Sequence, residues 1–344
     1  MQDTLRQLVA GKALTEAQAE LAFEHVLAGH ATEAQVSALL ALLARNGVSV
    51  PELVGAARSM RRHVMRVPID AAKLDGHIVD TCGTGGAPKT FNISTAAAII
   101  AAAARGPAGE RVYVAKHGNR SRTGRGSAEV LMQLGINVDA TPETQAKCLR
   151  EAGLCFCFAI HHHPAMRHAA GPRKSLGFPT IFNLLGPLTN PAGAGRQLLG
   201  VYDRSFVRLM AETLAILGAE RAMVAHGMDG LDEITTTAPT VIAEVRAGAV
   251  EESMFDAAST GVPRATLEAL RVETLDDAGR LIRAILAGAG PEEPTNIALV
   301  NAAAALVVGE VCPDMASALR AASEAITSGA AERTLDALGK ASAE

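Results

Sequence analysis

The sequence has no excess of charge of either sign and no long apolar run, and each absence argues against a class of protein. Its 344 residues carry 32 basic and 36 acidic side chains, a formal net charge of −4 at pH 7. A protein whose main partner is duplex nucleic acid or an anionic membrane needs a basic surface, so we expect neither partner. The alanine-rich run at residues 95–104 is too short and too weakly apolar to cross a bilayer.

Cysteines are few, and their spacing does not suggest a disulfide framework. They are Cys82, Cys148, Cys155, Cys157 and Cys312. The first four residues also lack the basic stretch and apolar core of a signal peptide, so we expect none. Reduced thiols in a cytoplasmic protein are the simplest interpretation.

The first 67 residues predict a set of short amphipathic helices. Capping-box patterns begin at Thr15, Thr32 and Ser49, and each has Gln or Glu three residues later. Such helices cannot cover their own apolar faces. We therefore expect a small helical domain, residues 1–72, that packs on the rest of the chain and on a second copy in a dimer.

From about residue 76, short β-rich runs alternate with helical stretches. The strand-like runs are 78–79, 112–115, 155–158, 198–202 and 222–225. This alternation predicts an α/β domain, residues 73–344, with a mostly parallel sheet covered by helices. Ligands of such sheets bind at the carboxyl ends of the strands. Residues 271–292 and 316–341 are expected to form the closing helices.

A glycine-rich turn at residues 80–86 follows the first strand-like run. Glycines let backbone amides approach an anion, and the N-terminus of a following helix offers unpaired N–H groups. That helix opens with Asn92-Ile93-Ser94-Thr95, in which Ser94 could cap the helix, ligate a metal, or both. The turn alone is weak evidence, because linkers often contain such glycines; together with residues 92–95 it predicts a phosphate-binding loop.

A second turn, Lys116-His117-Gly118-Asn119-Arg120-Ser121, follows the next strand-like run. A solvated charged turn would explain Lys116 and Arg120, but not the Gly-Asn between them. Asn119 can offer a donor and an acceptor to a small polar ligand. We therefore predict a second phosphate site.

Residues 229–233 place three carboxylates in one predicted loop. A solvated acidic turn is the ordinary explanation. Mg²⁺, however, typically takes one or two carboxylates together with substrate phosphates, and Asp232 and Glu233 would supply them. With the two glycine-bearing turns, the pair predicts a magnesium-assisted site for a polyphosphorylated sugar.

Three other clusters of histidine, cysteine and basic residues are better explained by a structural role than by a functional one. Residues 161–163 are three consecutive histidines whose side chains point in different directions, so a zinc site is not favoured. Cys155 and Cys157 alternate with phenylalanines and are expected in the core. Arg61, with neighbouring basic residues, is expected on a solvated helix face.

These motifs occur in an order that resembles the anthranilate phosphoribosyltransferase family of tryptophan biosynthesis. The resemblance also includes His163-Pro164-Ala165-Met166 and the twelve-residue block 180–191, and it covers essentially the whole chain. It implies the nucleoside phosphorylase/phosphoribosyltransferase fold, a homodimer, and a helical contribution from about 165–185 to the small domain. It also implies transfer of the phosphoribosyl group of 5-phosphoribosyl 1-diphosphate (PRPP) to the amine of anthranilate.

The resemblance assigns roles to individual residues and requires no protein nucleophile. PRPP would be bound by Gly83, Gly86, Ala87, Thr90, Asn92, Ser94, Thr95, Lys116, Gly118, Asn119, Arg120 and Ser121. Anthranilate would be met by Gly83, Asn119, His163 and Arg173. Two Mg²⁺ ions would be held by Ser94, Asp232 and Glu233.

The sequence departs from the family pattern at Ala87, where aspartate is common, and at Pro179, where arginine is common. Three alternatives stay open at this point. They are a phosphoribosyltransferase for another aromatic acceptor, a pyrimidine nucleoside phosphorylase-like enzyme, and a non-catalytic nucleic-acid-binding relative. A magnesium requirement argues against the second, and the absence of a basic charge excess argues against the third.

Overall fold

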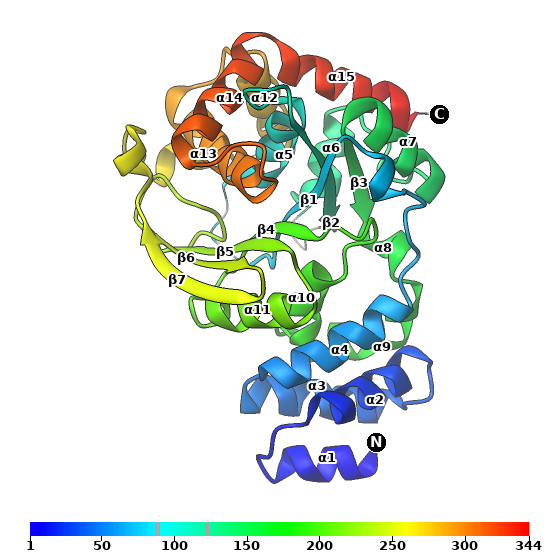
Figure 1. The fold of residues 1–344 in the computed structure, drawn as a ribbon. Coiled ribbons are helices and arrows are strands. Elements are labelled where there is room, and N and C mark those ends of the chain that lie inside the picture. The colour runs from blue at the N-terminus through cyan, green and yellow to red at the C-terminus, as the bar shows by residue number, and fades with distance from the viewer. Residues whose placement is uncertain (87, 89, 121–123, 344) are drawn as a thin grey trace.

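A small helical domain lies beside a larger α/β domain in the computed structural model, which describes residues 1–86, 88, 90–120 and 124–343 (Figure 1). The first domain begins with α1 (Gln2–Val9), α2 (Glu16–Leu27), α3 (Glu33–Asn46) and α4 (Val50–Arg62). Among the described residues, no helix combines the length and apolarity needed to cross a membrane.

The helix starts in this domain are those expected from the capping residues. Thr15 accepts a hydrogen bond from the Gln18 amide, and the Gln18 side chain accepts one from the Thr15 amide. Thr32 and Gln35 repeat the arrangement at the start of α3. At α4, the buried Glu52 accepts from the Ser49 amide, at 2.8 Å. Satisfying orphan helix N–H groups in this way is worth about 1 kcal/mol for each cap.

The large domain contains a seven-stranded sheet in the order β3-β2-β1-β4-β5-β6-β7. The strands are β1 (Gly76–Gly83), β2 (Arg111–Gly118), β3 (Leu154–Phe158), β4 (Arg196–Gly200), β5 (Arg221–Gly227), β6 (Thr240–Arg246) and β7 (Ala249–Phe255). The first five strands are parallel and match the five expected runs, except that β4 ends at Gly200. The antiparallel pair β6 and β7 was not anticipated, because edge strand β7 is largely exposed and lacks an apolar face.

Helices cover both faces of this sheet (Figure 1). The helices that pack on one face or cover its rim are α5 (Ile93–Ala103), α6 (Ser127–Gln133), α7 (Pro142–Ala152), α12 (Leu275–Leu286), α13 (Glu292–Val308), α14 (Met315–Thr327) and α15 (Ala330–Ser342). On the opposite face α11 (Ser205–Ile216) packs against β5, β6 and β7. The apolar helix α5 lies beside α13 over the middle of the sheet, so the alanine-rich run is core.

Two expected helices have different bounds. The helix predicted over 271–292 is confined to α12, and the long α13 that follows was not expected. The run 316–341 forms two helices, because Gly329 has a φ of +72° at the break between α14 and α15. A local apolar pattern does not reveal such a break, since both helices bury faces of the same character.

Two later segments pack against the helical domain. They are α9 (Arg167–Leu176) and α10 (Ile181–Leu185), joined to β3 through α8 (Ala159–His162). The Phe182 ring meets the fully buried Phe23 ring of α2 edge to face, at a centroid distance of 5.6 Å. Arg61 is not on a solvated face as expected, because its guanidinium donates to the carbonyls of Leu188 and Leu217 in the large domain.

Candidate active site

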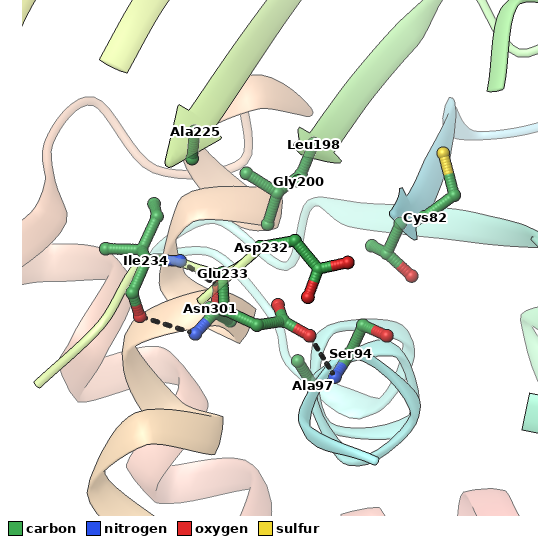
Figure 2. Close-up of a pocket in the computed structure, with 11 residues that line it drawn as sticks. Cys82, Ser94, Ala97, Leu198, Gly200, Ala225, Asp232, Glu233, Ile234 and Asn301 are labelled. Atoms are coloured by element: carbon green, nitrogen blue, oxygen red, sulfur yellow. Dashed lines mark hydrogen bonds between the residues drawn. The ribbon is translucent and has the colours of Figure 1, made fainter. Parts of the chain in front are cut away.

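The site lies where the strand order reverses. The chain runs from β1 outward to β3 and returns to the other side of β1 as β4, which creates a crevice at the carboxyl ends of these two strands. A pocket occupies this position, with about 260 Å³ of empty space when the solvent at its mouth is included. Its lining residues are Thr81, Cys82, Ser94, Ala97, Leu198, Gly200, Ala225, Asp232, Glu233, Ile234 and Asn301 (Figure 2).

The first predicted turn follows β1 and approaches the acidic pair closely. A Cβ atom on Gly83 would lie only 2.8 Å from Oδ2 of Asp232, so the glycine permits this approach. Gly86 has a φ of +104°, in the left-handed region that favours glycine, and lies against the Tyr202 ring. The turn therefore places its backbone directly beside the Asp232 carboxylate.

The second predicted turn contributes a buried cation. Lys116 is only 3% exposed, and its Nζ donates to the Thr81 carbonyl at 2.6 Å and to Ser94 Oγ at 3.0 Å. Burial lowers the pKa of Lys116, and Glu233 opposes that change by favouring the charged form. Lys116 and Glu233 therefore lie in one site, as the predicted magnesium-assisted site requires.

The two carboxylates meet the N-terminal turn of α5. Oε1 of Glu233 accepts from the Ser94 amide at 3.2 Å, and the Asp232 carboxylate points into the space beside Ser94 and β1 (Figure 2). Desolvation raises the pKa of both side chains, and with the nearby charge of Asp232 it raises the pKa of Glu233 to about 8. Ser94 does not cap the helix, because Asn92 is the N-cap residue.

This donor set suits Mg²⁺. All the donors are oxygens, and burial raises the pKa of both carboxylates although the charge of Lys116 favours their ionised forms. Among the described residues, no three or more histidine, cysteine or acidic side chains are grouped to hold a metal. A cation bound by Asp232, Glu233 and Ser94 would complete its shell with water and substrate oxygens, which is how Mg²⁺ is usually held.

A second group of predicted residues lies toward the helical domain. Nε2 of His163 is 3.2 Å from Nε2 of His117, and both rings are buried. Arg173, on α9, stacks its guanidinium over the Phe182 ring at 5.3 Å. In the described part of the chain, the Arg173 side chain has neither a hydrogen bond nor an ion pair, so its charge is free to bind an anion.

Other predicted residues take different positions. Asn119 and Arg120 are exposed at the end of β2, and the Arg120 guanidinium lies 5.6 Å above the Phe158 ring, at the end of β3. Thr90 donates to the Phe91 carbonyl, whereas Thr95 is fully buried. Ala87 and Ser121 are outside the described residues, and Gly118 ends β2.

Sequence reasoning missed two residues of the site. Asn301, on α13, accepts from the Ile234 amide and donates to the Ile234 carbonyl, which holds the acidic loop in place (Figure 2). No local pattern marks it. His117 was overlooked although it stands inside the second motif, where its position beside Lys116 was a usable sign.

The hydrogen bonds of the two histidines define their tautomers. Nδ1 of His117 faces the Gly186 carbonyl at 3.1 Å, and a carbonyl only accepts, so this nitrogen carries the proton. Nε2 of His117 then accepts from His163. Nδ1 of His163 is thereby left unprotonated, and it is buried without a partner. Both rings are neutral in this arrangement.

We expect these histidines to make the protein less stable in mild acid. Burial lowers the pKa of His163 to about 4 and that of His117 well below its usual range. An unfolded histidine titrates near 6.5, so between pH 6.5 and 4 the unfolded state binds more protons and stability falls as the pH falls. His163 alone should lower the free energy of unfolding by about 2 kcal/mol from pH 7 to pH 5.

Denaturant unfolding at the two pH values measures this change. The pH dependence of the free energy of unfolding should be smaller in His163→Gln than in wild type. It should persist in His161→Gln, whose ring is exposed and paired with Asp139. An equal pH dependence in wild type and His163→Gln would contradict the assignment.

Comparison with known proteins identifies the class to which this fold and site belong. Residues 75–332 match the α/β domain of a glycosyl transferase family, and residues 2–64 match the helical bundle domain of the same family. The chain is 46% identical to the anthranilate phosphoribosyltransferase of Moorella thermoacetica, covering 97% of this chain and 96% of that one. It is 45% identical to the enzyme of Rubrobacter xylanophilus, covering 98% and 96% of the two chains. The chain therefore belongs to the anthranilate phosphoribosyltransferase family.

Solved structures agree with this assignment. The crystal structure of anthranilate phosphoribosyltransferase from Thermus thermophilus has 34% identity and a TM-score of 0.89, covering 99% of this chain and 100% of the other. The enzyme of Saccharomyces cerevisiae, solved in complex with PRPP and Mg, shares the fold with a TM-score of 0.87 at 23% identity, covering 99% of this chain and 97% of the yeast chain.

Proposed function

We propose that this protein transfers the phosphoribosyl group of PRPP to the amine of anthranilate in tryptophan biosynthesis. The observation that carries the proposal is the convergence of Lys116, Ser94 and the pair Asp232–Glu233 in one crevice of a chain from this family. In the reaction the bond from C1 of the ribose to the diphosphate oxygen breaks, and a bond from C1 to nitrogen forms. Pyrophosphate leaves, and the amine loses one proton.

PRPP is proposed to bind across the two turns and the N-terminus of α5. The backbone from Gly83 to Gly86 would face the diphosphate, which the N-terminal amides of α5 favour. Lys116 would stabilise the negative charge that develops on the leaving pyrophosphate. The remaining predicted PRPP residues are assigned to the same role, with Asn119 and Arg120 reaching in from the rim of the site.

Two Mg²⁺ ions are proposed, held through Asp232, Glu233 and Ser94. When bound, they would neutralise the diphosphate and make it a better leaving group. The residues of the chain supply the rest: they orient C1 toward the acceptor and exclude competing water. The yeast relative solved with PRPP and Mg supports magnesium use.

Anthranilate is proposed to bind between the second turn and α9. Arg173 would pair with its carboxylate through the guanidinium fork. His163 would face its amine, whose nitrogen is already neutral near pH 7 and needs no activation. Gly83 and Asn119 would complete the pocket. A yeast relative has been solved in complex with 4-fluoroanthranilate.

Loss of anthranilate fluorescence on addition of PRPP and Mg²⁺ tests the proposal, with EDTA as the control. Consumption of anthranilate and release of pyrophosphate in equal amounts are expected, and EDTA should stop both. Unchanged anthranilate together with consumption of another arylamine would indicate the alternative acceptor. Activity with inorganic phosphate and a nucleoside, without metal, would indicate the phosphorylase.

We also propose a cytoplasmic homodimer formed through the helical domain, with the division into domains at residue 72. Val9 of α1 and Leu21 of α2 are 66% and 71% exposed, which leaves apolar surface for a partner. Sedimentation velocity should give twice the 35.5 kDa mass of the chain. A species of single-chain mass at micromolar concentration would contradict the dimer.

A further inference from the structure

Strands β1 and β2 pair only over their first halves. Their register runs from Gly76 opposite Arg111 to Val79 opposite Val114. Beyond these residues β1 pairs with β4 and β2 pairs with β3. The sheet therefore divides into two arms, which we call the strand fork. One arm leads to the first phosphate turn and the other leads to the second.

Side chains satisfy the backbone groups that this fork leaves without ladder partners. The Asn190 amide donates to the Ala115 carbonyl at 2.8 Å. The His117 amide donates to Asp80 Oδ1 at 3.0 Å, and the Thr81 carbonyl accepts from Lys116. Buried backbone groups need such partners; two of these bonds cross from one arm to the other, and the third comes from Asn190, which is on neither arm.

The 186–190 segment, which is part of the twelve-residue block, lies against the fork. The Gly186 carbonyl accepts from His117, and the Pro187 carbonyl accepts from the Gln197 amide of β4 at 2.7 Å. With the Asn190 bond, the segment thus contacts β2 twice and β4 once. On its other side, the Leu188 carbonyl accepts from Arg61 of the helical domain, at 2.8 Å.

We propose that the 186–190 segment positions the two phosphate turns by holding the arms of the fork at a defined separation. The inference rests on the proposed function, since its purpose is to match the two turns to one PRPP molecule. The segment supplies no side chain to the pocket lining, so it acts through the strands. This role also explains the presence of the twelve-residue block 180–191, to which we have assigned no contact with substrate.

Asn190 provides the sharpest test because its two polar atoms have different partners. Its Nδ2 donates to the Ala115 carbonyl and also faces Asp80, whereas its Oδ1 accepts from the Ala192 amide at 2.9 Å within the local turn. Asn190→Asp keeps the turn contact and its shape but removes the donor to the fork. Asn190→Ala removes both contacts. A matched control is Glu52→Gln, which disturbs a buried polar group of the helical domain whose hydrogen-bond partners, Leu14 and Ser49, lie outside the fork and the segment.

The experiment measures the Kd of PRPP by calorimetry at saturating Mg²⁺, together with Tm, for each variant. We expect both Asn190 variants to weaken PRPP binding by about tenfold or more, because displacement of binding groups by a fraction of an ångström is costly. Glu52→Gln should lower Tm with a Kd within about twofold of wild type. If Asn190→Asp loses Tm but binds PRPP like wild type, the segment has only a structural role and the inference is overturned.

The same measurement separates this inference from the proposed function. Wild-type protein that does not bind PRPP would overturn the function itself. Wild-type binding with unchanged binding in both Asn190 variants would overturn only the positioning role.

Discussion

Glu233→Gln is expected to lower kcat/KM for PRPP by about two to three orders of magnitude, the size of effect seen when a group that stabilises transition-state charge is removed. The carboxylate is a proposed magnesium ligand that accepts a hydrogen bond from the α5 N-terminal turn, and in its ionised form it favours the charged form of Lys116. The amide keeps its size and its bond from the Ser94 amide but loses the charge. Initial rates against Mg²⁺ concentration check the result, and added Mg²⁺ should restore part of the rate.

Asp229→Asn is the matched control because it removes a carboxylate from the same loop. Asp229 accepts from the Leu231 amide and from Thr235, so its role is local. If both variants lose activity equally and neither responds to Mg²⁺, the loss reflects loop folding and the metal assignment fails.

The pH dependence of magnesium binding follows from the same carboxylate. Desolvation raises the pKa of Glu233 to about 8, so near pH 7 the metal-free protein mostly holds a proton there. Magnesium must displace this proton, and its affinity should therefore rise from pH 6 to pH 8. In the metal-free protein the raised pKa means that stability falls as the pH rises from about 4.5 toward 8.

Arg173→Met is expected to raise the KM for anthranilate by about 30- to 100-fold, corresponding to loss of a charge-assisted hydrogen-bonded pair. Arg173 is a half-buried cation of α9 whose side chain has no hydrogen bond or ion pair in the described structure, and its guanidinium lies over the Phe182 ring. The KM for PRPP should change little, because the phosphate turns follow β1 and β2, whereas Arg173 lies on α9.

Lys174→Met is the control, since this neighbouring cation is exposed. Arg173→Lys should recover only part of the affinity, because an ammonium cannot form the bidentate pair. Equal KM values for anthranilate in wild type and Arg173→Met would remove Arg173 from the acceptor site. An increase in the KM for both substrates would indicate general distortion.

Much of the fold could be predicted from the sequence, because helix caps and strand patterns depend on residues that are neighbours in the chain. The capping boxes at Thr15 and Thr32 and the five parallel strands were all found. The β6–β7 pair and α13 were missed because an exposed edge strand and an apolar helix lack a distinctive period. Arg61 was misjudged because its partners are carbonyls far away in sequence.

The sequence alone was enough to predict the residues to which we assign the chemistry: the glycines that permit close approach, Lys116, the acidic pair and Arg173. The glycines, Lys116 and the acidic pair were recognisable because each stands in a short motif, whereas Arg173 was implied by the family resemblance. Three features became visible in the folded structure alone: Lys116 and Glu233 share one crevice, His117 and His163 are neutral partners, and β1 and β2 diverge around the 186–190 segment. The reason is that strand order and burial set these distances and pKa values, and both depend on contacts between residues far apart in the chain.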